Sequence, residues 1–163
     1  MASFPPVPSF AQLVRSPVLL LAFGFGSGCA RKAPGTFGTL AALPLTYLLL
    51  LLPLPGYLAV VLLAGVLGIW ICHAASRKLE VHDHPGIVWD EFVGLWVTCI
   101  ALPAGWWWPL LGFGLFRLFD IAKPWPISWL DRHVHGGLGI MIDDILAGLF
   151  AAVVIQLLAL ILS

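Results

Sequence analysis

The last apolar run of the chain, residues 140–162, reads IMIDDILAGLFAAVVIQLLALIL, and its only charged side chains are Asp143 and Asp144 near its start. A helix rises about 1.5 Å per residue, so roughly 20 mostly apolar residues cross a hydrocarbon core of about 30 Å. The run is long enough to do so. It predicts a membrane-spanning helix with two acids close to one membrane face.

The composition of the whole chain also indicates a membrane protein. Of its 163 residues, 61% are hydrophobic and 10% are charged, against roughly 45–50% and about 25% in soluble domains. So much apolar sequence excludes a soluble cytosolic enzyme and a disordered chain. Eight basic residues balance eight acidic ones, so no net positive field favours nucleic acid as a partner. We predict one integral-membrane domain, residues 1–163.

Apolar runs place the predicted membrane crossings. Five of them are candidates: 37–52, 57–75, 87–102, 104–122 and 140–162. A further run, 17–28, is too short to cross and is rich in glycine, so we expect a short re-entrant or interfacial helix there. Residues 1–16 are expected to form a loosely ordered tail. The predicted fold is all-α, a polytopic membrane helix bundle with about five crossings.

Charge is distributed unevenly over the predicted loops. The connections 53–56 and 103–109 carry none, whereas the alternate connections hold basic residues such as Arg31, Arg77 and Arg132. Basic residues in short loops mark the cytoplasmic side. This topology puts every charged side chain and all five histidines in or near the cytoplasmic half. Trp125 and Trp129 then fit an inner aromatic belt.

Two adjacent acidic pairs each lie near the start of a predicted helix: Asp90-Glu91 and Asp143-Asp144. The dipole at a helix N-terminus favours one such acid. Two at the edge of hydrocarbon are harder to explain, because an uncompensated carboxylate there costs several kcal/mol. A bound divalent cation would offset that cost. Consecutive helical residues point about 100° apart, so the second acid of a pair could bind another ion, orient a water or hold a base.

A fifth acid, Asp120, lies one helical turn after Arg117. Residues at i and i+3 share a helix face and can form an ion pair. That pair is either a charge-neutralising structural bridge or a device in which Arg117 holds an anion and Asp120 orients it.

The segment Ala33–Leu40, APGTFGTL, follows Arg31 and Lys32 and opens an apolar helix. Thr36 or Thr39 could cap that helix. Free backbone N–H groups beside two cations form a candidate phosphate seat.

Three histidines and one acid in the inner loops are candidates to hydrogen-bond the groups that bind the ligand and so to orient them. They are His82, Asp83, His84 and His135. Direct metal ligation by the two His-x-His pairs is the less common role for such residues.

Four motifs in this chain together resemble a known family. They are Pro34-Gly35-Thr36-x-Gly38-Thr39, His82-Asp83-His84 through Trp89-Asp90-Glu91-x-Val93-Gly94, Phe116-Arg117-x-x-Asp120-x-x-Lys123-Pro124-Trp125-Pro126-Ile127, and His135-Gly136-Gly137-x-Gly139-Ile140-Met141-x-Asp143-Asp144-x-x-Ala147-Gly148. In this order, from about residue 17 to about residue 155, they resemble bacterial phosphatidylglycerophosphatase A. Thr39 stands where serine is common in that family.

The resemblance implies a Mg²⁺-dependent lipid phosphatase in the bacterial inner membrane, multi-pass, with its active site facing the cytoplasm. It would hydrolyse phosphatidylglycerophosphate to phosphatidylglycerol and phosphate, so its partners would be a phospholipid substrate and the bilayer. The candidate catalytic residues are Asp90, Glu91, Asp120, Asp143 and Asp144, and all but Asp120 are the expected ligands of one or two Mg²⁺. The expected phosphate-binding residues are Arg31, Lys32, Thr36, Arg117 and Lys123.

One alternative class of function remains at this point. A small transporter or channel could use intramembrane carboxylates as ion ligands. It predicts acids spread across the bilayer depth, whereas the acids here gather at one face. Attack by water and a covalent aspartyl-phosphate both remain open as mechanisms.

Overall fold

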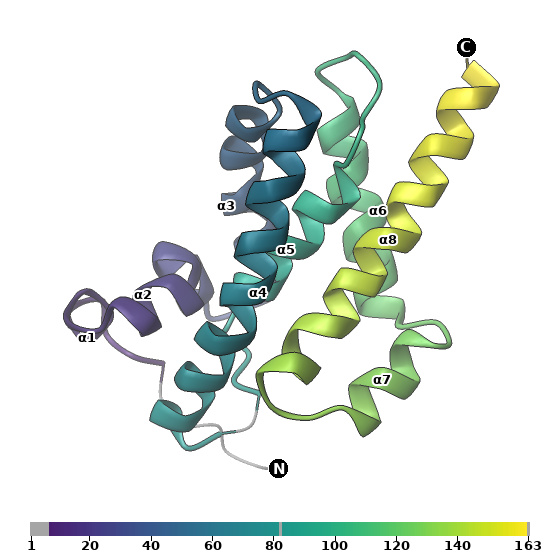
Figure 1. The fold of residues 1–163 in the computed structure, drawn as a ribbon. Helices are drawn as coiled ribbons and strands as arrows, with labels where there is room; N and C mark the ends of the chain where they lie inside the picture. Colours follow the sequence, from purple (N-terminus) through teal and green to yellow (C-terminus); the bar gives the residue numbers. More distant parts are fainter. Residues whose placement is uncertain (1–6, 82, 163) are drawn as a thin grey trace.

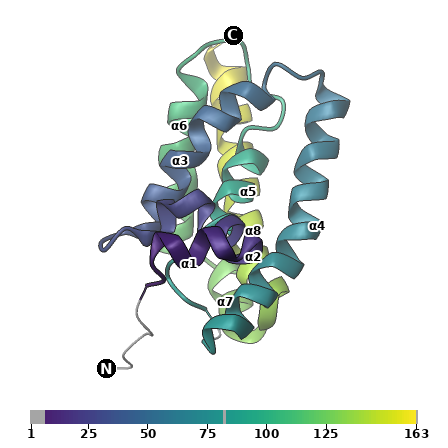
Figure 2. The same ribbon diagram turned by 90° about the vertical axis from the view of Figure 1, so that its left-hand side faces the viewer.

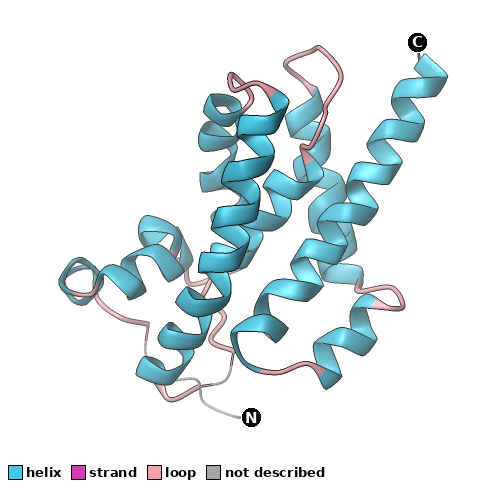
Figure 3. Cartoon of the chain, viewed as in Figure 1, coloured by secondary structure: helices cyan, strands magenta, loops and turns pink. Residues whose placement is uncertain are grey.

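The computed structural model describes residues 7–81 and 83–162 of the chain. Every regular element within these ranges is a helix, and none of them is a strand (Figure 3). The all-α prediction is therefore confirmed. His82, one of the residues expected to orient site groups, lies outside the described ranges.

Five helices alternate in direction along the bundle (Figure 1). Their bounds are α3 Pro34–Leu49, α4 Leu54–Leu79, α5 Trp89–Thr98, α6 Trp108–Ala122 and α8 Gly136–Leu162. They correspond in order to the five apolar runs of the sequence. The end at which α3, α5 and α8 begin and α4 and α6 end carries the charged segments, because those segments lie in or beside the connections at that end.

The N-terminal part of the described chain lies across the bundle rather than along it (Figure 2). It consists of α1 Phe10–Arg15, α2 Pro17–Ala22 and the 3-10 turn η1 Gly24–Cys29. The run 17–28 thus forms short helices, as expected of a segment that does not cross. Within residues 1–16, expected to be a loose tail, α1 is a regular helix and its Leu13 is fully buried.

Helix α5 is the centre of the fold. It packs against α3, α4, α6 and α8, and its residues from Phe92 to Thr98 are all buried. Side chains on α4 and α5 reach across to backbone groups of the facing helix: Tyr57 Oη donates to Trp96 O at 2.7 Å and Trp89 Nε1 donates to Ala64 O at 3.2 Å. Hydrogen bonds of this kind satisfy polar groups where water is absent.

Small residues set the distance between α5 and α8. A Cβ placed on Gly148 would lie 2.4 Å from Gly94 O, and one on Gly94 would lie 2.5 Å from the Phe116 ring. Close approach of helix backbones through small residues is a common packing mode in membrane bundles. The acids at the start of α5 and in the third turn of α8 are brought near each other by this contact.

Two of the helices, α4 and α8, are long and apolar enough to cross a membrane. The other three matching the predicted crossings have 16, 10 and 15 residues. At about 1.5 Å per residue, the shortest of them, α5, spans only about half of a hydrocarbon core. The chain therefore has membrane-type helices, but five crossings are not confirmed.

Helix α7, Ile127–His133, was not predicted. It lies at the charged end of the bundle, in the connection that leads from α6 to α8 (Figure 1). It contacts α8, and its first residue, Ile127, is fully buried.

Candidate active site

A cavity of about 270 Å³ opens at the charged end of the bundle. Four parts of the chain form it: the start of α3, the segment 83–91, the end of α6 and the second and third turns of α8. Its charged lining residues are Asp83, Asp90, Glu91, Arg117, Asp120, Lys123, Asp143 and Asp144. Segments far apart in the sequence thus place five buried or half-buried acids and two cations around one space.

Three of the acids form the tightest cluster. Asp90, Glu91 and Asp144 each offer a carboxylate oxygen, and these oxygens lie within 4.8 Å of one another. Asp90 is 9% exposed and Asp144 is 3% exposed. One oxygen of each of the three side chains is buried and has no hydrogen-bond partner among the described residues. Three carboxylates at this spacing repel one another, and their unpartnered buried oxygens add a desolvation penalty.

The chemistry of this cluster fits a divalent cation. Oxygen ligands from carboxylates are what Mg²⁺ and Ca²⁺ bind in proteins. A cation there would remove the mutual repulsion and satisfy the buried oxygens at once. Asp90, Glu91 and Asp144 are therefore the side chains that could hold a metal.

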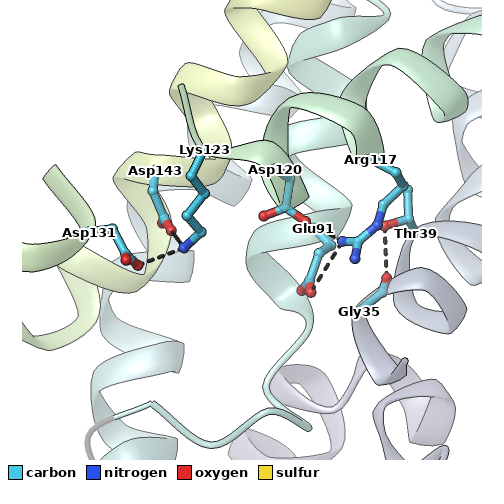
Figure 4. Close-up of polar contacts among 8 residues, drawn as sticks. All are labelled: Gly35, Thr39, Glu91, Arg117, Asp120, Lys123, Asp131 and Asp143. Carbon is cyan, nitrogen blue, oxygen red and sulfur yellow. Dashed lines mark hydrogen bonds and ion pairs between the residues drawn. The ribbon is translucent and has the colours of Figure 1, made fainter. Parts of the chain in front are cut away.

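Asp143 is turned to a different partner. Its Oδ2 lies 2.7 Å from Lys123 Nζ, and the same Nζ lies 2.6 Å from Asp131 Oδ1 (Figure 4). Of the roles left open for the second acid of a pair, this contact corresponds to holding a neighbouring basic side chain, here Lys123. The expected four-carboxylate set is thus divided, with three acids in the cluster and Asp143 beside it on the ammonium group.

Lys123 occupies a special backbone position. It ends α6 in the left-handed region, with φ 41° and ψ 58°, and Pro124 follows it. A proline at that place cannot continue the helix. Burial disfavours the charged ammonium, but the hydrogen bonds to Asp131 and Asp143 outweigh burial and raise the pKa of Lys123 above its ordinary value of 10.5.

Arg117 is the second cation of the cavity. It forms ion pairs with Asp120, one turn along α6, and with Glu91 on α5 at 3.8 Å (Figure 4). Its Nε is buried without a hydrogen-bond partner among the described residues. The Arg117–Asp120 pair deduced from the sequence is present, and it also reaches an acid of the cluster.

The start of α3 lines the cavity with Gly35, and no threonine caps this helix. Ala33 is the N-cap residue, with φ 48°, and no side chain caps the helix. The prediction that Thr36 or Thr39 caps it is wrong, because the helix begins at Pro34; Thr39 Oγ1 instead donates to Gly35 O at 2.8 Å (Figure 4). Gly35 lies against Glu91 and Arg117, so closely that a Cβ there would be 2.2 Å from Glu91 Oε1.

Several predicted site residues lie away from the cavity lining. Arg31 and Lys32 are exposed on the segment before α3, and Thr36 is half-buried in its first turn. His84 is buried, packs against the Phe23 ring and accepts a hydrogen bond from Gly86 N at 3.0 Å, which closes the turn before α5. His135 is exposed just before α8. Of the candidates to orient site groups that the structure describes, Asp83 lines the cavity, whereas His84 and His135 do not.

Sequence reasoning missed Asp131. Its position on an unpredicted short helix hid its contact with Lys123. One feature of the sequence could have indicated this contact: Asp131 follows Lys123 by eight residues in a connection at the charged end.

These features together define a class of protein: a helical bundle with membrane-type helices and, at one end, an acidic cavity suited to a divalent cation and a phosphate group. The comparisons with known proteins agree with that class. The profile of the phosphatidylglycerophosphatase A family matches residues 20–159. The chain belongs to the phosphatidylglycerophosphatase A family.

Individual relatives cover most of the chain. The phosphatidylglycerophosphatase A of Escherichia coli (strain K12) is 53% identical over 138 residues, 84% of this chain and 80% of the relative. That of Haemophilus influenzae is 46% identical over 142 residues, 86% of this chain and 87% of the relative. A Bacteroides thetaiotaomicron protein, provisionally named a phosphatidylinositol-3-phosphatase, is 38% identical over 84% of this chain and 90% of its own. No solved structure matches the chain.

Proposed function

We propose that the protein is a Mg²⁺-dependent phosphatase that hydrolyses phosphatidylglycerophosphate to phosphatidylglycerol and inorganic phosphate. The names of the two more similar relatives support the substrate. The observation that carries the metal dependence is the cluster of Asp90, Glu91 and Asp144, each of which has one buried oxygen without a hydrogen-bond partner among the described residues.

The three clustered acids would hold the metal ion, with room in the cavity for water and a phosphate group. Mg²⁺ bound there would offset charge on the phosphoryl oxygens and lower the pKa of a water molecule. In the reaction, one water adds to phosphorus, the P–O bond to the glycerol breaks, and the glycerol oxygen leaves as the alcohol with one proton.

The two cavity cations would bind the phosphoryl oxygens. Arg117 presents a guanidinium that can bind two oxygens at once, and Asp120 and Glu91 fix its position. Lys123 presents a point charge at the opposite side of the cavity (Figure 4). Because catalysis of phosphoryl transfer is mainly positioning and charge stabilisation, these two residues are expected to matter as much as the metal ligands.

The membrane topology belongs to the same proposal. The five alternating helices would cross the bacterial inner membrane, with the short α5 enclosed by its neighbours, and the basic connections would face the cytoplasm. The cavity would then open at the cytoplasmic leaflet, where a lipid phosphate can enter it from the bilayer plane.

The test is phosphate release from phosphatidylglycerophosphate by the purified, reconstituted protein, with Mg²⁺ and with excess chelator. We expect release with Mg²⁺ and its loss with chelator. Release that persists at full rate after exhaustive chelation would contradict the metal dependence, and no release under either condition would contradict the activity. Neither the family nor the gathering of acids at one end favours the transporter or channel alternative.

A further inference from the structure

An apolar surface adjoins the cavity on the side of α7. Trp125, Pro126, Trp129 and Leu130 outline a hollow of about 420 Å³, here called the α7 surface. Trp125 is 79% exposed and Trp129 is 51% exposed. Together these two aromatic side chains present an apolar surface that an apolar ligand can cover.

One residue of the cavity, Lys123, contacts the helix that carries the α7 surface. Lys123 lines the cavity and bonds Asp143 there, and it also bonds Asp131 on α7. A single residue, Pro124, separates Lys123 from Trp125. A lipid with an anionic group at Lys123 would therefore have α7 close to the rest of its head group, with its acyl chains beyond.

The surface is held in a fixed shape. The His133 ring stacks on Trp129 with 4.7 Å between ring centroids and 19° between planes, and its Nδ1 lies 2.7 Å from Trp129 O. Ile127 anchors the helix in the core. Rigid aromatic groups lose little conformational entropy when they bind a partner.

We infer that the α7 surface binds the diacylglycerol portion of the lipid whose phosphate occupies the cavity. The inference rests on the proposed function and adds to it a second, apolar site for the same substrate. A charged cavity and an apolar surface, linked by the Lys123–Asp131 contact, match the polar and apolar portions of a phospholipid. Tryptophan also favours the level of the membrane where head groups meet acyl chains. Specificity for a lipid over a soluble phosphate ester would then come from α7, and hydrolysis from the cavity.

The experiment compares two substrates that differ only in their chains, dioleoyl and dibutanoyl phosphatidylglycerophosphate, on the full chain in detergent. For the double variant Trp125→Ala/Trp129→Ala we expect KM for the dioleoyl substrate to rise about tenfold, the size of effect that loss of a large apolar contact gives. The kcat should stay within about twofold, since the cavity is unchanged. Neither constant should change for the dibutanoyl substrate.

Two controls separate lipid binding from general effects. Trp106→Ala removes a tryptophan that is 75% exposed at the opposite end of the bundle, and it should leave both substrates unaffected. Trp125→Phe/Trp129→Phe keeps aromatic surface and should restore most of the affinity. If the double alanine variant does not fold, the single change at the highly exposed Trp125 provides the same comparison.

Three results would overturn the inference: an unchanged KM for the dioleoyl substrate, an equal rise for both substrates, or an equal effect of Trp106→Ala. A change from dimer to monomer in the tryptophan variants with an unaltered KM would also overturn it, because a second copy would then be the occupant. If the wild-type protein releases no phosphate from either substrate, the proposed function itself fails. If the wild-type protein is active but its KM does not depend on these tryptophans, only the present inference fails.

Discussion

Gly35 and Glu91 approach each other so closely that a Cβ on the glycine would lie 2.2 Å from Glu91 Oε1. The same Cβ would lie 3.1 Å from an Arg117 nitrogen. The glycine is therefore needed for space. It leaves the space in which the acid and the arginine of the cavity lie together.

Gly35→Ala is expected to reduce phosphate release at least about tenfold, because displacement of a positioning group by even an ångström disturbs the reacting geometry. Within a helix, alanine is favoured over glycine by about 1 kcal/mol, so a loss of activity without loss of folding would report the clash. The measurement is kcat and KM beside a thermal unfolding curve.

Gly114→Ala is the matched control for that change. Gly114 also lies in a helix, and apart from that helix's own backbone a Cβ there would meet no described atom within 4 Å. Its activity should equal that of the wild type. Wild-type activity in Gly35→Ala as well would show that Glu91 and Arg117 yield easily and that their placement is not critical.

The adjacent acids Asp143 and Asp144 are expected to differ in their effect on Mg²⁺ dependence. Asp144 belongs to the carboxylate cluster, whereas Asp143 Oδ2 is bonded to Lys123. Asp144→Asn and Glu91→Gln should raise the Mg²⁺ concentration for half-maximal activity about tenfold or more, as changes close to a metal do. Asp143→Asn should act mainly on KM for the lipid. A Mg²⁺ titration of phosphate release separates the two effects.

Glu80→Gln provides the control for these charge removals, since Glu80 is exposed at the end of α4 and does not line the cavity. Its titration should overlie that of the wild type. An equal shift in Asp143→Asn and Asp144→Asn would contradict the division of the acidic pair.

The activity profile from about pH 6 to about pH 9 is expected to owe nothing to Lys123. Its pKa is raised above 10.5 in the folded protein, since the hydrogen bonds to Asp131 and Asp143 outweigh burial. The stability that this shift contributes is therefore fully present below the ordinary pKa and is lost only as pH rises through the raised value. Lys123→Met should lower activity at every pH in that range without changing the profile's shape.

Lys123→Arg tests whether charge alone suffices at this position. It keeps the positive charge and should retain more activity than Lys123→Met. A limb of the pH profile that disappears in Lys123→Met would show that Lys123 titrates in the neutral range and would refute the assignment.

Gly148→Ala is expected to destabilise the bundle by about 1–3 kcal/mol, the usual effect of inserting a group into a close-packed contact. The new Cβ would lie 2.4 Å from Gly94 O, a backbone atom that cannot turn away. Because α5 carries Asp90 and α8 carries Asp144, moving the two helices apart should also separate these acids and lower activity. Thermal unfolding in detergent and a rate assay measure the two effects.

Gly65→Ala is the corresponding control, since among the described residues a Cβ at Gly65 meets only Val93 at 3.9 Å, an ordinary contact. It should leave stability and activity unaltered. Equal unfolding temperatures in Gly148→Ala and Gly65→Ala would mean that the α5–α8 contact does not set the spacing of the acids.

Much of the fold followed from local pattern. The long apolar runs predicted α4 and α8, and the position of proline, glycine and charge between runs predicted which ends lie together. Helix α7 was missed because it has only seven residues and too little periodicity to distinguish it from a loop. The prediction of a threonine cap for α3 was wrong because the N-cap residue is Ala33. Ala33 adopts a left-handed conformation, which the preference of threonine for cap positions could not indicate.

The candidate site divides in the same way. The acidic pairs, Arg117, Asp120 and Lys123 could be identified from the sequence, because charged residues beside hydrocarbon need an explanation wherever they fold. The contacts that these residues make with one another could not be identified from the sequence. Spacing along a helix says that two adjacent acids diverge, but it does not say which of them meets the acids of another helix.

The amino-acid sequence by itself determined an apolar, all-helical chain with its charges at one end, since periodicity, helix length and the cost of burying charge are local properties. Only the tertiary structure decided that Asp144 joins Asp90 and Glu91 while Asp143 turns to Lys123 and Asp131. It also decided that Gly35 makes room for Glu91. The reason is that these relationships depend on the rotation and spacing of helices packed against one another, which glycine contacts such as Gly94–Gly148 fix and no single segment encodes.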